Sequence, residues 1–119
     1  MRGDSLQNNY RKGVASLVIL SLLRREDMYG YQLVQETARV SGGLLTTQEG
    51  SLYPVLYRLV EQGYITDRKV LVGKRMTRVY YHLEPLGAEH LDSLIQDYTN
   101  VTTGVFRILR SGENSEENP

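Results

Sequence analysis

The chain has 119 residues, no cysteine and a formal net charge of zero. This length fits one compact domain whose core needs no metal or disulfide, and the lack of cysteine excludes disulfides and thiolate metal sites. The longest apolar run, residues 14–23, contains two serines and is shorter than the roughly 20 residues of a membrane span, and no secretory signal is visible. We therefore expect a cytoplasmic protein.

The charges are unevenly distributed along the chain. Between residues 58 and 78 the basic residues outnumber Glu61 and Asp67; they are Arg58, Arg68, Lys69, Lys74, Arg75 and Arg78. Residues 84–97 carry only acidic charges, and residues 111–119 add three glutamates. Because only the surface that meets phosphate has to be basic, a net charge of zero does not exclude a nucleic-acid partner.

The first part of the chain predicts an arm followed by a helix. Residues 1–8 are polar, and we expect a flexible arm there. From residue 9 to residue 25 apolar residues recur at helical spacing, at Val14, Leu17, Val18 and Leu22. The remaining face is apolar too, at Ile19, Leu20 and Leu23. A helix that is apolar nearly all round is buried on more than one side, and we expect another chain to cover the second side.

A second helix is predicted over residues 29–40. Its inward residues are Leu33, Thr37 and Val40. The Ser-Gly-Gly sequence at 41–43 should end it, because glycine readily adopts the left-handed conformation of a helix C-cap. Leu44 and Leu45 are then expected to return to the core.

A third helix is predicted over residues 46–62, ended by Gly63. Thr46 and Glu49 have the spacing of a capping box, and Gln48 is a weaker cap candidate. Pro54 falls in the first turn or just past it, where its missing N–H does least harm. The inward stripe is Leu52, Val55, Leu56, Leu59 and Val60.

The next segment predicts a β-hairpin. One strand starts at residue 64 and extends to residue 72, Gly73 and Lys74 form the turn, and a second strand covers residues 77–83. Val79 and Tyr81 should occupy one face of this strand, and Tyr80 and His82 the other. A hairpin directly after a helix–turn–helix is typical of the wing of a winged helix.

Residues 85–110 predict one long last helix, followed by a disordered acidic tail over residues 111–119. Two series of residues seven apart form an a/d seam: Leu91, Tyr98 and Val105, and Leu94, Val101 and Ile108. Gly104 weakens this segment as an isolated helix by about 1 kcal/mol. Packing against a partner would offset that loss, so the seam predicts a dimerisation helix.

Three sequence blocks occur in this order: Met28-Tyr29-Gly30-Tyr31, the Gly50–Leu59 block Gly-Ser-Leu-Tyr-Pro-Val-Leu-Tyr-Arg-Leu with Gly63-Tyr64-Ile65 after it, and Arg78-Val79-Tyr80-Tyr81-His82-Leu83 with Gly87 after it. Together they resemble the signature blocks of the PadR family of bacterial transcriptional regulators over about residues 11–110. The short C-terminal region resembles the smaller subgroup with a single terminal helix. Val79 and His82 replace basic residues of the family pattern, which weakens the expectation of phosphate contacts from that strand.

The resemblance implies a mainly α fold with a small β-hairpin. A winged helix–turn–helix DNA-binding domain would cover residues 9–84, and a C-terminal dimerisation helix residues 85–110. A recognition helix places its N-terminal residues in the major groove, and a wing reaches the minor groove or flanking phosphates. The predicted DNA contacts are Thr47, Gln48, Ser51, Tyr53, Tyr57, Arg58, Lys74, Arg75 and Arg78.

Several of these residues have a structural alternative. Tyr53, like Tyr29 and Tyr31, is favoured as a packing residue over a DNA contact. Arg58 can be a solvated side chain, and Lys74 and Arg75 can be an ordinary polar turn. His82 and His90 have no cysteine or nearby second histidine, so no metal is expected.

The resemblance also implies a homodimer formed by the first and last helices. The predicted interface residues are Val14, Leu17, Leu91, Leu94, Tyr98, Val101 and Val105. In some relatives a small aromatic or phenolic effector binds near this interface and releases DNA. Those relatives often use a tryptophan there, whereas this chain has no tryptophan and carries Tyr98 at the matching place. Ligand stacking on Tyr98 is open, but core packing is favoured.

The sequence thus predicts a sequence-specific regulator, a repressor, that binds a palindromic operator in double-stranded DNA and needs no cofactor. A protein–protein interaction module is the alternative class, because winged helices serve that purpose too and the net charge is zero. An enzyme is disfavoured, because the sequence has no cysteine, no paired histidines and no phosphate-binding glycine loop.

Overall fold

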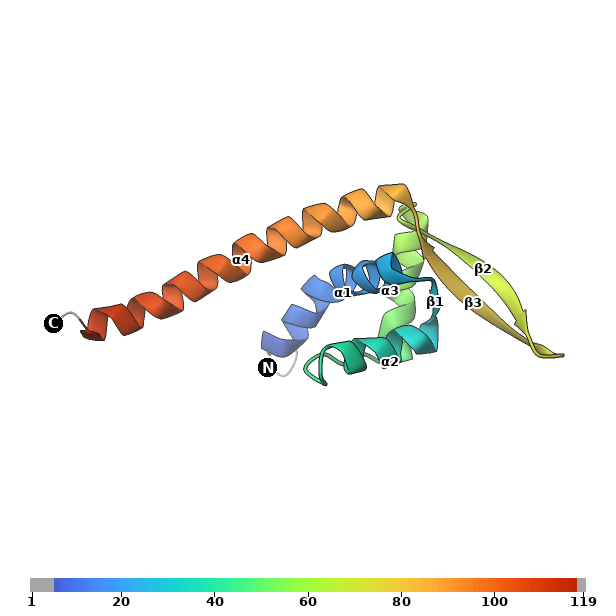
Figure 1. The fold of residues 1–119 in the computed structure, drawn as a ribbon, viewed down its shortest axis with the longest axis horizontal. Coiled ribbons are helices and arrows are strands. Elements are labelled where there is room, and N and C mark those ends of the chain that lie inside the picture. Colours follow the sequence, from blue (N-terminus) through green and yellow to red (C-terminus); the bar gives the residue numbers. More distant parts are fainter. Residues whose placement is uncertain (1–5, 118–119) are drawn as a thin grey trace.

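The computed structural model describes the backbone of residues 6–117 and the side chains of residues 14–113. Within that range the chain forms four helices and a three-stranded antiparallel sheet that extends from one end of the helical body (Figure 1). The elements are α1 (Leu6–Arg25), β1 (Met28–Tyr29), α2 (Gly30–Val40), α3 (Glu49–Glu61), β2 (Ile65–Val72), β3 (Met76–Leu83) and α4 (Pro85–Glu117). This arrangement confirms the predicted fold class, a winged helix–turn–helix with a long last helix.

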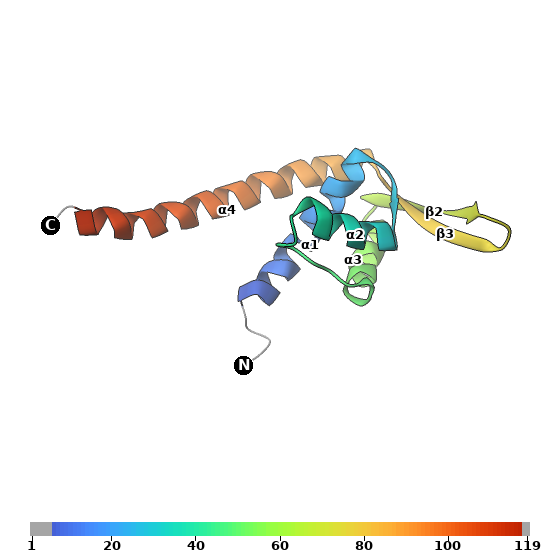
Figure 2. The same cartoon turned by 60° about the horizontal axis from the view of Figure 1, so that its bottom comes forward.

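The hairpin and the last helix leave the body of the protein in opposite directions. Figures 1 and 2 both show the β2–β3 hairpin projecting from one end, α4 reaching away from the other, and α1, α2 and α3 between them. The longest dimension is 72 Å. The tip of the hairpin and the far half of α4 therefore lie away from the core and present surface to other molecules.

The core draws side chains from every element. The residues whose side chains are fully buried are Leu20, Met28, Leu33, Leu56, Leu59, Ile65 and Leu91. Tyr81 of β3 adds a nearly buried ring, at 8% exposure. A fully buried side chain of this kind contributes roughly 1.5–3 kcal/mol, so α1 to α3, the sheet and the start of α4 form one stable unit.

The sheet has the order β1-β3-β2, with β3 in the centre. Ile65 pairs with Leu83, Lys69 with Val79 and Val72 with Met76. Directly paired residues share a face, so the buried Ile65 and Tyr81, together with Val79, mark an inner face that packs toward the helices. The other face, which includes Thr66, Arg68 and Tyr80, is the outer face.

The first turn of α4 is held closely against the body. A Cβ on Gly87 would lie 2.0 Å from the carbonyl oxygen of Tyr64, so only glycine fits there. That carbonyl also accepts a hydrogen bond from the backbone N–H of Glu84, at 3.0 Å. The rings of Tyr64 and His90 stack with centroids 4.2 Å apart, and Arg24 of α1 forms a 2.7 Å ion pair with Asp92.

The loop before α3 differs from the prediction. The helix begins at Glu49 rather than at residue 46, and its N-cap Gln48 makes no side-chain hydrogen bond, so the capping box of Thr46 was wrong. The hydroxyl of Ser41 instead accepts a hydrogen bond from the N–H of Leu45 and donates one to its carbonyl, at 3.0 and 3.1 Å. These bonds hold the loop around residue 45 and keep Thr46 outside the helix.

Two residues predicted to face the core are exposed. Val40 is 50% exposed because α2 ends there, beyond the reach of the core. Leu44 is 82% exposed, since it follows Gly42 and Gly43, whose positive φ angles turn the chain outward. The two-residue strand β1 was not predicted, because Met28 and Tyr29 show no periodicity of their own and pair only with β3.

Both ends of the chain are more helical than expected. The helix α1 starts at Leu6, so residues 6–8 of the predicted arm belong to it, and residues 1–5 lie outside the described range. At the other end α4 continues to Glu117, so residues 111–117 are helical rather than a disordered tail, and residues 118–119 are outside the description. Gly112 does not adopt the positive φ that would end the helix, and a lone glycine costs a helix only about 1 kcal/mol.

Candidate nucleic-acid interface

The helices α2 and α3 form the helix–turn–helix, and Gly30 allows their close approach. A Cβ on Gly30 would lie 2.5 Å from the hydroxyl oxygen of Tyr53, so the tyrosine ring lies directly against the start of α2. Tyr53 remains 42% exposed at its other side. This contact favours the packing role for Tyr53 among the predicted contact residues.

The inner face of β3 contributes a second tyrosine behind α3. Burial raises the pKa of the Tyr81 phenol above its ordinary value, and the nearby Tyr53, Asp67 and Tyr57 raise this pKa further. The phenol therefore stays neutral over the physiological pH range. Its ring belongs to the same buried core cluster as Leu56 and Leu59 of α3.

The predicted major-groove residues border a groove between α1, the loop before α3, and α3 itself. Its volume is about 1150 Å³, and Val14, Val18 and Val55 belong to its apolar wall. The predicted contact residues on its other wall are Thr47, Gln48, Ser51, Tyr57 and Arg58. The structure thus brings these five residues together: Thr47 and Gln48 come from the loop before α3, and Ser51, Tyr57 and Arg58 come from α3 itself, with Arg58 in its last turn.

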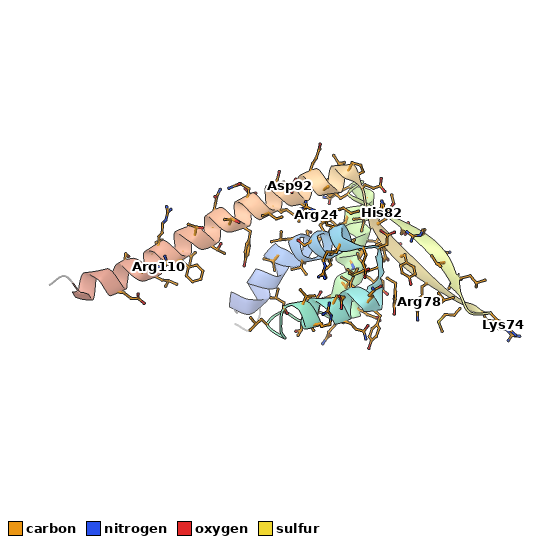
Figure 3. The ribbon with its side chains drawn as sticks, viewed as in Figure 1. Arg24, Lys74, Arg78, His82, Asp92 and Arg110 are labelled. Atoms are coloured by element: carbon orange, nitrogen blue, oxygen red, sulfur yellow. The ribbon has the colours of Figure 1, made fainter. Side chains whose placement is uncertain are left out.

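The wing residues Lys74 and Arg75 are exposed in the turn between β2 and β3. Figure 3 shows Lys74 at the far tip of the hairpin and Arg78 closer to the body. Within residues 14–113, Arg58, Lys69, Lys74 and Arg75 make no ion pair. These four cations are available to phosphate.

The other two basic residues between residues 58 and 78, Arg68 and Arg78, lie on the outer face of the sheet and contact side chains of the same chain. The guanidinium of Arg78 lies 4.4 Å from the ring centroid of Tyr29. Arg68 lies 5.6 Å from the centroid of Tyr80 and donates a 2.6 Å hydrogen bond to Asp27. Tyr29 and Tyr80 contact each other edge to face, with centroids 5.4 Å apart.

Asp27 connects both strands of the hairpin to the segment between α1 and β1. Its carboxylate accepts the hydrogen bond from Arg68 of β2 and lies 2.8 Å from Nδ1 of His82 on β3. The other ring nitrogen of His82 lies 3.8 Å from the carboxylate of Glu84. Burial alone would raise the pKa of Asp27, but the hydrogen bonds from His82 and Arg68 outweigh it and lower the pKa below its ordinary value.

Replacing Asp27 with asparagine should destabilise the protein at neutral pH by about 1 kcal/mol, because both partners are half exposed and solvent screens the pairs. A lowered folded-state pKa contributes stability above the unfolded pKa, and this contribution is lost as the pH falls through the folded pKa. Urea unfolding should therefore separate wild type from Asp27→Asn at pH 7 and bring them together near pH 3.

Asp67→Asn is the matched control, because Asp67 and Asp27 border one shallow hollow beside the hairpin. Unlike Asp27, Asp67 has no side-chain hydrogen bond or ion pair among the described residues. Its unfolding midpoint should follow the wild type at both pH values. An unchanged midpoint of Asp27→Asn at pH 7 would show that the carboxylate does not tie the hairpin to the body.

The predicted dimer residues divide into three groups by their burial. Leu91 is fully buried in the core of its own chain, so it leaves no surface for a partner and its prediction was wrong; Val14 is also buried within the chain. The side chains of Leu17 and Leu94 are partly buried against the core. Tyr98, Val101 and Val105 lie beyond the body on α4 and are 37%, 64% and 49% exposed.

Two kinds of feature were not found. No helix within the described residues is long and apolar enough to cross a membrane. The same part of the chain contains no cluster of three histidine, aspartate or glutamate side chains that would hold a metal ion.

Comparison with known proteins places the chain among transcriptional regulators. Residues 19–93 match the model of the transcriptional regulator PadR-like family. Transcriptional regulator YqjI of Escherichia coli is 37% identical over 73 residues, which cover 61% of this chain but 35% of that protein. The negative transcriptional regulator PadR of Bacillus subtilis is 28% identical over 78 residues, which cover 66% of this chain and 43% of that protein.

Solved structures resemble the fold over more of its length. A transcriptional regulator from Clostridium thermocellum superposes with a TM-score of 0.77 at 25% identity, covering 83% of this chain and 96% of that one. Bacillus subtilis PadR in complex with operator DNA superposes with a TM-score of 0.65 at 27% identity, covering 69% of this chain and 46% of that one. Since the family model matches more than half of the residues of this chain, the chain belongs to the PadR-like family of transcriptional regulators.

Proposed function

We propose that the protein is a transcriptional repressor that binds a palindromic operator as a homodimer, with α3 in the major groove and the hairpin as a wing. The distribution of unpaired charge carries this proposal. The unpaired cations of α3 and the hairpin are Arg58, Lys69, Lys74 and Arg75, whereas the acidic Glu89, Asp92 and Asp97 lie on α4. Figure 3 places Asp92 on α4, far from Lys74.

The relatives support the DNA-binding role and the repression. Bacillus subtilis PadR has been crystallised with operator DNA, and it is named a negative transcriptional regulator. The chain spans less than half of that protein and about a third of YqjI. For this chain, operator binding and repression therefore remain a proposal that rests on its own α3 and wing.

The homodimer is proposed from the exposed seam of α4. Tyr98, Val101 and Val105 are exposed in the single chain although they are large and apolar. A contiguous exposed apolar strip of this length marks an interaction surface. A twofold dimer would place two α3 helices in successive major grooves about 34–36 Å apart, which requires a palindromic operator.

A small aromatic effector is part of the same proposal, with Tyr98 as its stacking partner. Tyr98 lies in the middle of the seam, where a flat ligand between two chains would alter the distance between the two α3 helices. Such a ligand would release the operator without touching the DNA-binding face.

Selection of bound sequences from a pool of random duplexes tests the function. We expect an enriched palindrome, bound by two copies of the chain, that lowers transcription when placed across a promoter. If no duplex is enriched and the protein is not retained by DNA at low salt, the chain is a protein–protein interaction module instead.

Replacing Lys74 and Arg75 with alanine should weaken binding to specific and random duplexes alike. For each phosphate that the variant no longer neutralises, the slope of log K against log salt should become shallower by about 0.9. The slope is measured by fluorescence anisotropy over a salt series. Arg107→Ala with Arg110→Ala removes the same charge from the far half of α4 (Figure 3) and should leave the slope unchanged. Equal slopes for the wing variant and wild type would contradict the wing assignment.

A further inference from the structure

The outermost line of α3 is apolar from residue 50 to residue 57. The buried residues of this helix are Leu52, Val55, Leu56 and Leu59. At 100° per residue, the direction opposite to their mean passes through Gly50, Pro54 and Tyr57, and reaches the acidic Glu61 only in the last turn. Gly50, Pro54 and Tyr57 are exposed, and Tyr57 is 73% exposed, although it is a large aromatic residue.

This line offers little hydrogen bonding to a base edge. Gly50 has no side chain and Pro54 offers only ring methylenes, so the phenol hydroxyl of Tyr57 is the one polar side-chain group among these three residues. A Cβ on Gly50 would meet nothing within 4 Å, so the helix backbone is open to close approach there. The polar residues Ser51 and Arg58 lie to one side of the line, and they border the groove toward α1 together with Pro54 and Tyr57.

The apolar line is accompanied by positive charge. Arg58 lies on its flank, and Lys69 extends from the inner face of β2, both without an ion pair among the described residues. Phosphate groups line both edges of a DNA major groove, and the apolar group on its floor is the C5-methyl of thymine. An apolar line beside free cations therefore fits a major groove that presents thymine methyl groups.

We propose that Pro54 and Tyr57 select thymine in the operator through apolar contact with its C5-methyl group. This inference rests on the proposed entry of α3 into the major groove, and it assigns the sequence preference to surface contact rather than to the hydrogen bonds of Gln48 and Ser51.

The test uses the selected operator in two forms, one with thymine and one with deoxyuridine at every thymine position. Deoxyuridine keeps the hydrogen-bonding groups and lacks only the methyl. Burying one methyl contributes about a fourfold gain in affinity, so one contact in each half-site predicts that the deoxyuridine duplex binds roughly sixteenfold more weakly. Titrations of both duplexes by fluorescence anisotropy give this ratio.

Protein variants distinguish the loss of a methyl contact from an effect of deoxyuridine on the flexibility of the DNA. Tyr57→Ala should reduce the thymine-to-deoxyuridine ratio, and Pro54→Ala with Tyr57→Ala should bring it close to one; circular dichroism confirms that both remain folded. Tyr31→Ala removes a similarly exposed tyrosine from α2 and should keep the wild-type ratio.

Equal binding of the two duplexes by wild type would overturn the inference and leave the proposed function standing. A double variant that binds both duplexes more weakly but keeps the wild-type ratio would overturn it as well. Failure of wild type to bind the thymine duplex more tightly than random DNA would overturn the proposed function and this inference with it.

Discussion

A protein with alanine in place of Gly87 is expected to unfold at a much lower denaturant concentration than wild type. The new Cβ would lie 2.0 Å from the carbonyl oxygen of Tyr64 and 2.8 Å from its carbonyl carbon, which are backbone atoms that cannot rotate away. Relief requires α4 to move off the body, which would withdraw Leu91 from the core. We expect a loss of about 3 kcal/mol or more in the free energy of unfolding.

Urea unfolding followed by circular dichroism measures this loss, at equal protein concentration because a dimer's stability depends on it. Gly50→Ala is the matched control, since it also places alanine in a helix, but at a position with nothing within 4 Å. That variant should be as stable as wild type or gain up to about 1 kcal/mol. Equal midpoints for Gly87→Ala and wild type would mean that α4 does not start against residue 64.

Periodicity was sufficient to predict the elements that bury one face. The inward stripe of α3, from Leu52 to Val60, was predicted from helical spacing; four of its five residues are buried, and Val60 is partly buried against the core. The hairpin followed from alternating residues on both sides of Gly73, which has a positive φ of 72°. In α3 and the hairpin, the periodicity of apolar residues along the sequence and the packing in the folded protein agree.

Contacts between distant segments could not be predicted. In the cluster around Asp27, Arg68 is 41 positions and His82 is 55 positions away from Asp27 along the chain. Nothing in the local sequence distinguishes Asp27 from a solvated turn residue. Leu91 fits the heptad spacing of the seam, but the first turns of α4 pack against the core of their own chain. Seam residues are therefore exposed to a partner only in the later turns of α4. Gly87 was noted only as part of a sequence block, because the carbonyl it accommodates belongs to residue 64.

Replacing Val101 with aspartate is expected to convert the proposed dimer to a monomer. Val101 is 64% exposed in the single chain, so the substitution should leave the fold of each protomer intact. In the proposed dimer two carboxylates would be buried in an apolar seam, and a buried unpaired charge costs several kcal/mol. Sedimentation equilibrium at micromolar concentration should give the mass of one chain for the variant and of two chains for wild type.

The loss of the dimer should also reduce operator affinity by roughly a hundredfold or more, because a monomer binds one half-site without the advantage of a linked second half-site. Thr103→Asp is the control, since Thr103 is exposed on the same helix two residues away and lies outside the a/d seam. This control should remain dimeric and bind the operator as wild type does. A dimeric Val101→Asp variant would show that α4 is not the interface. In that case the exposed Val101 and Val105 would mark a surface for another partner.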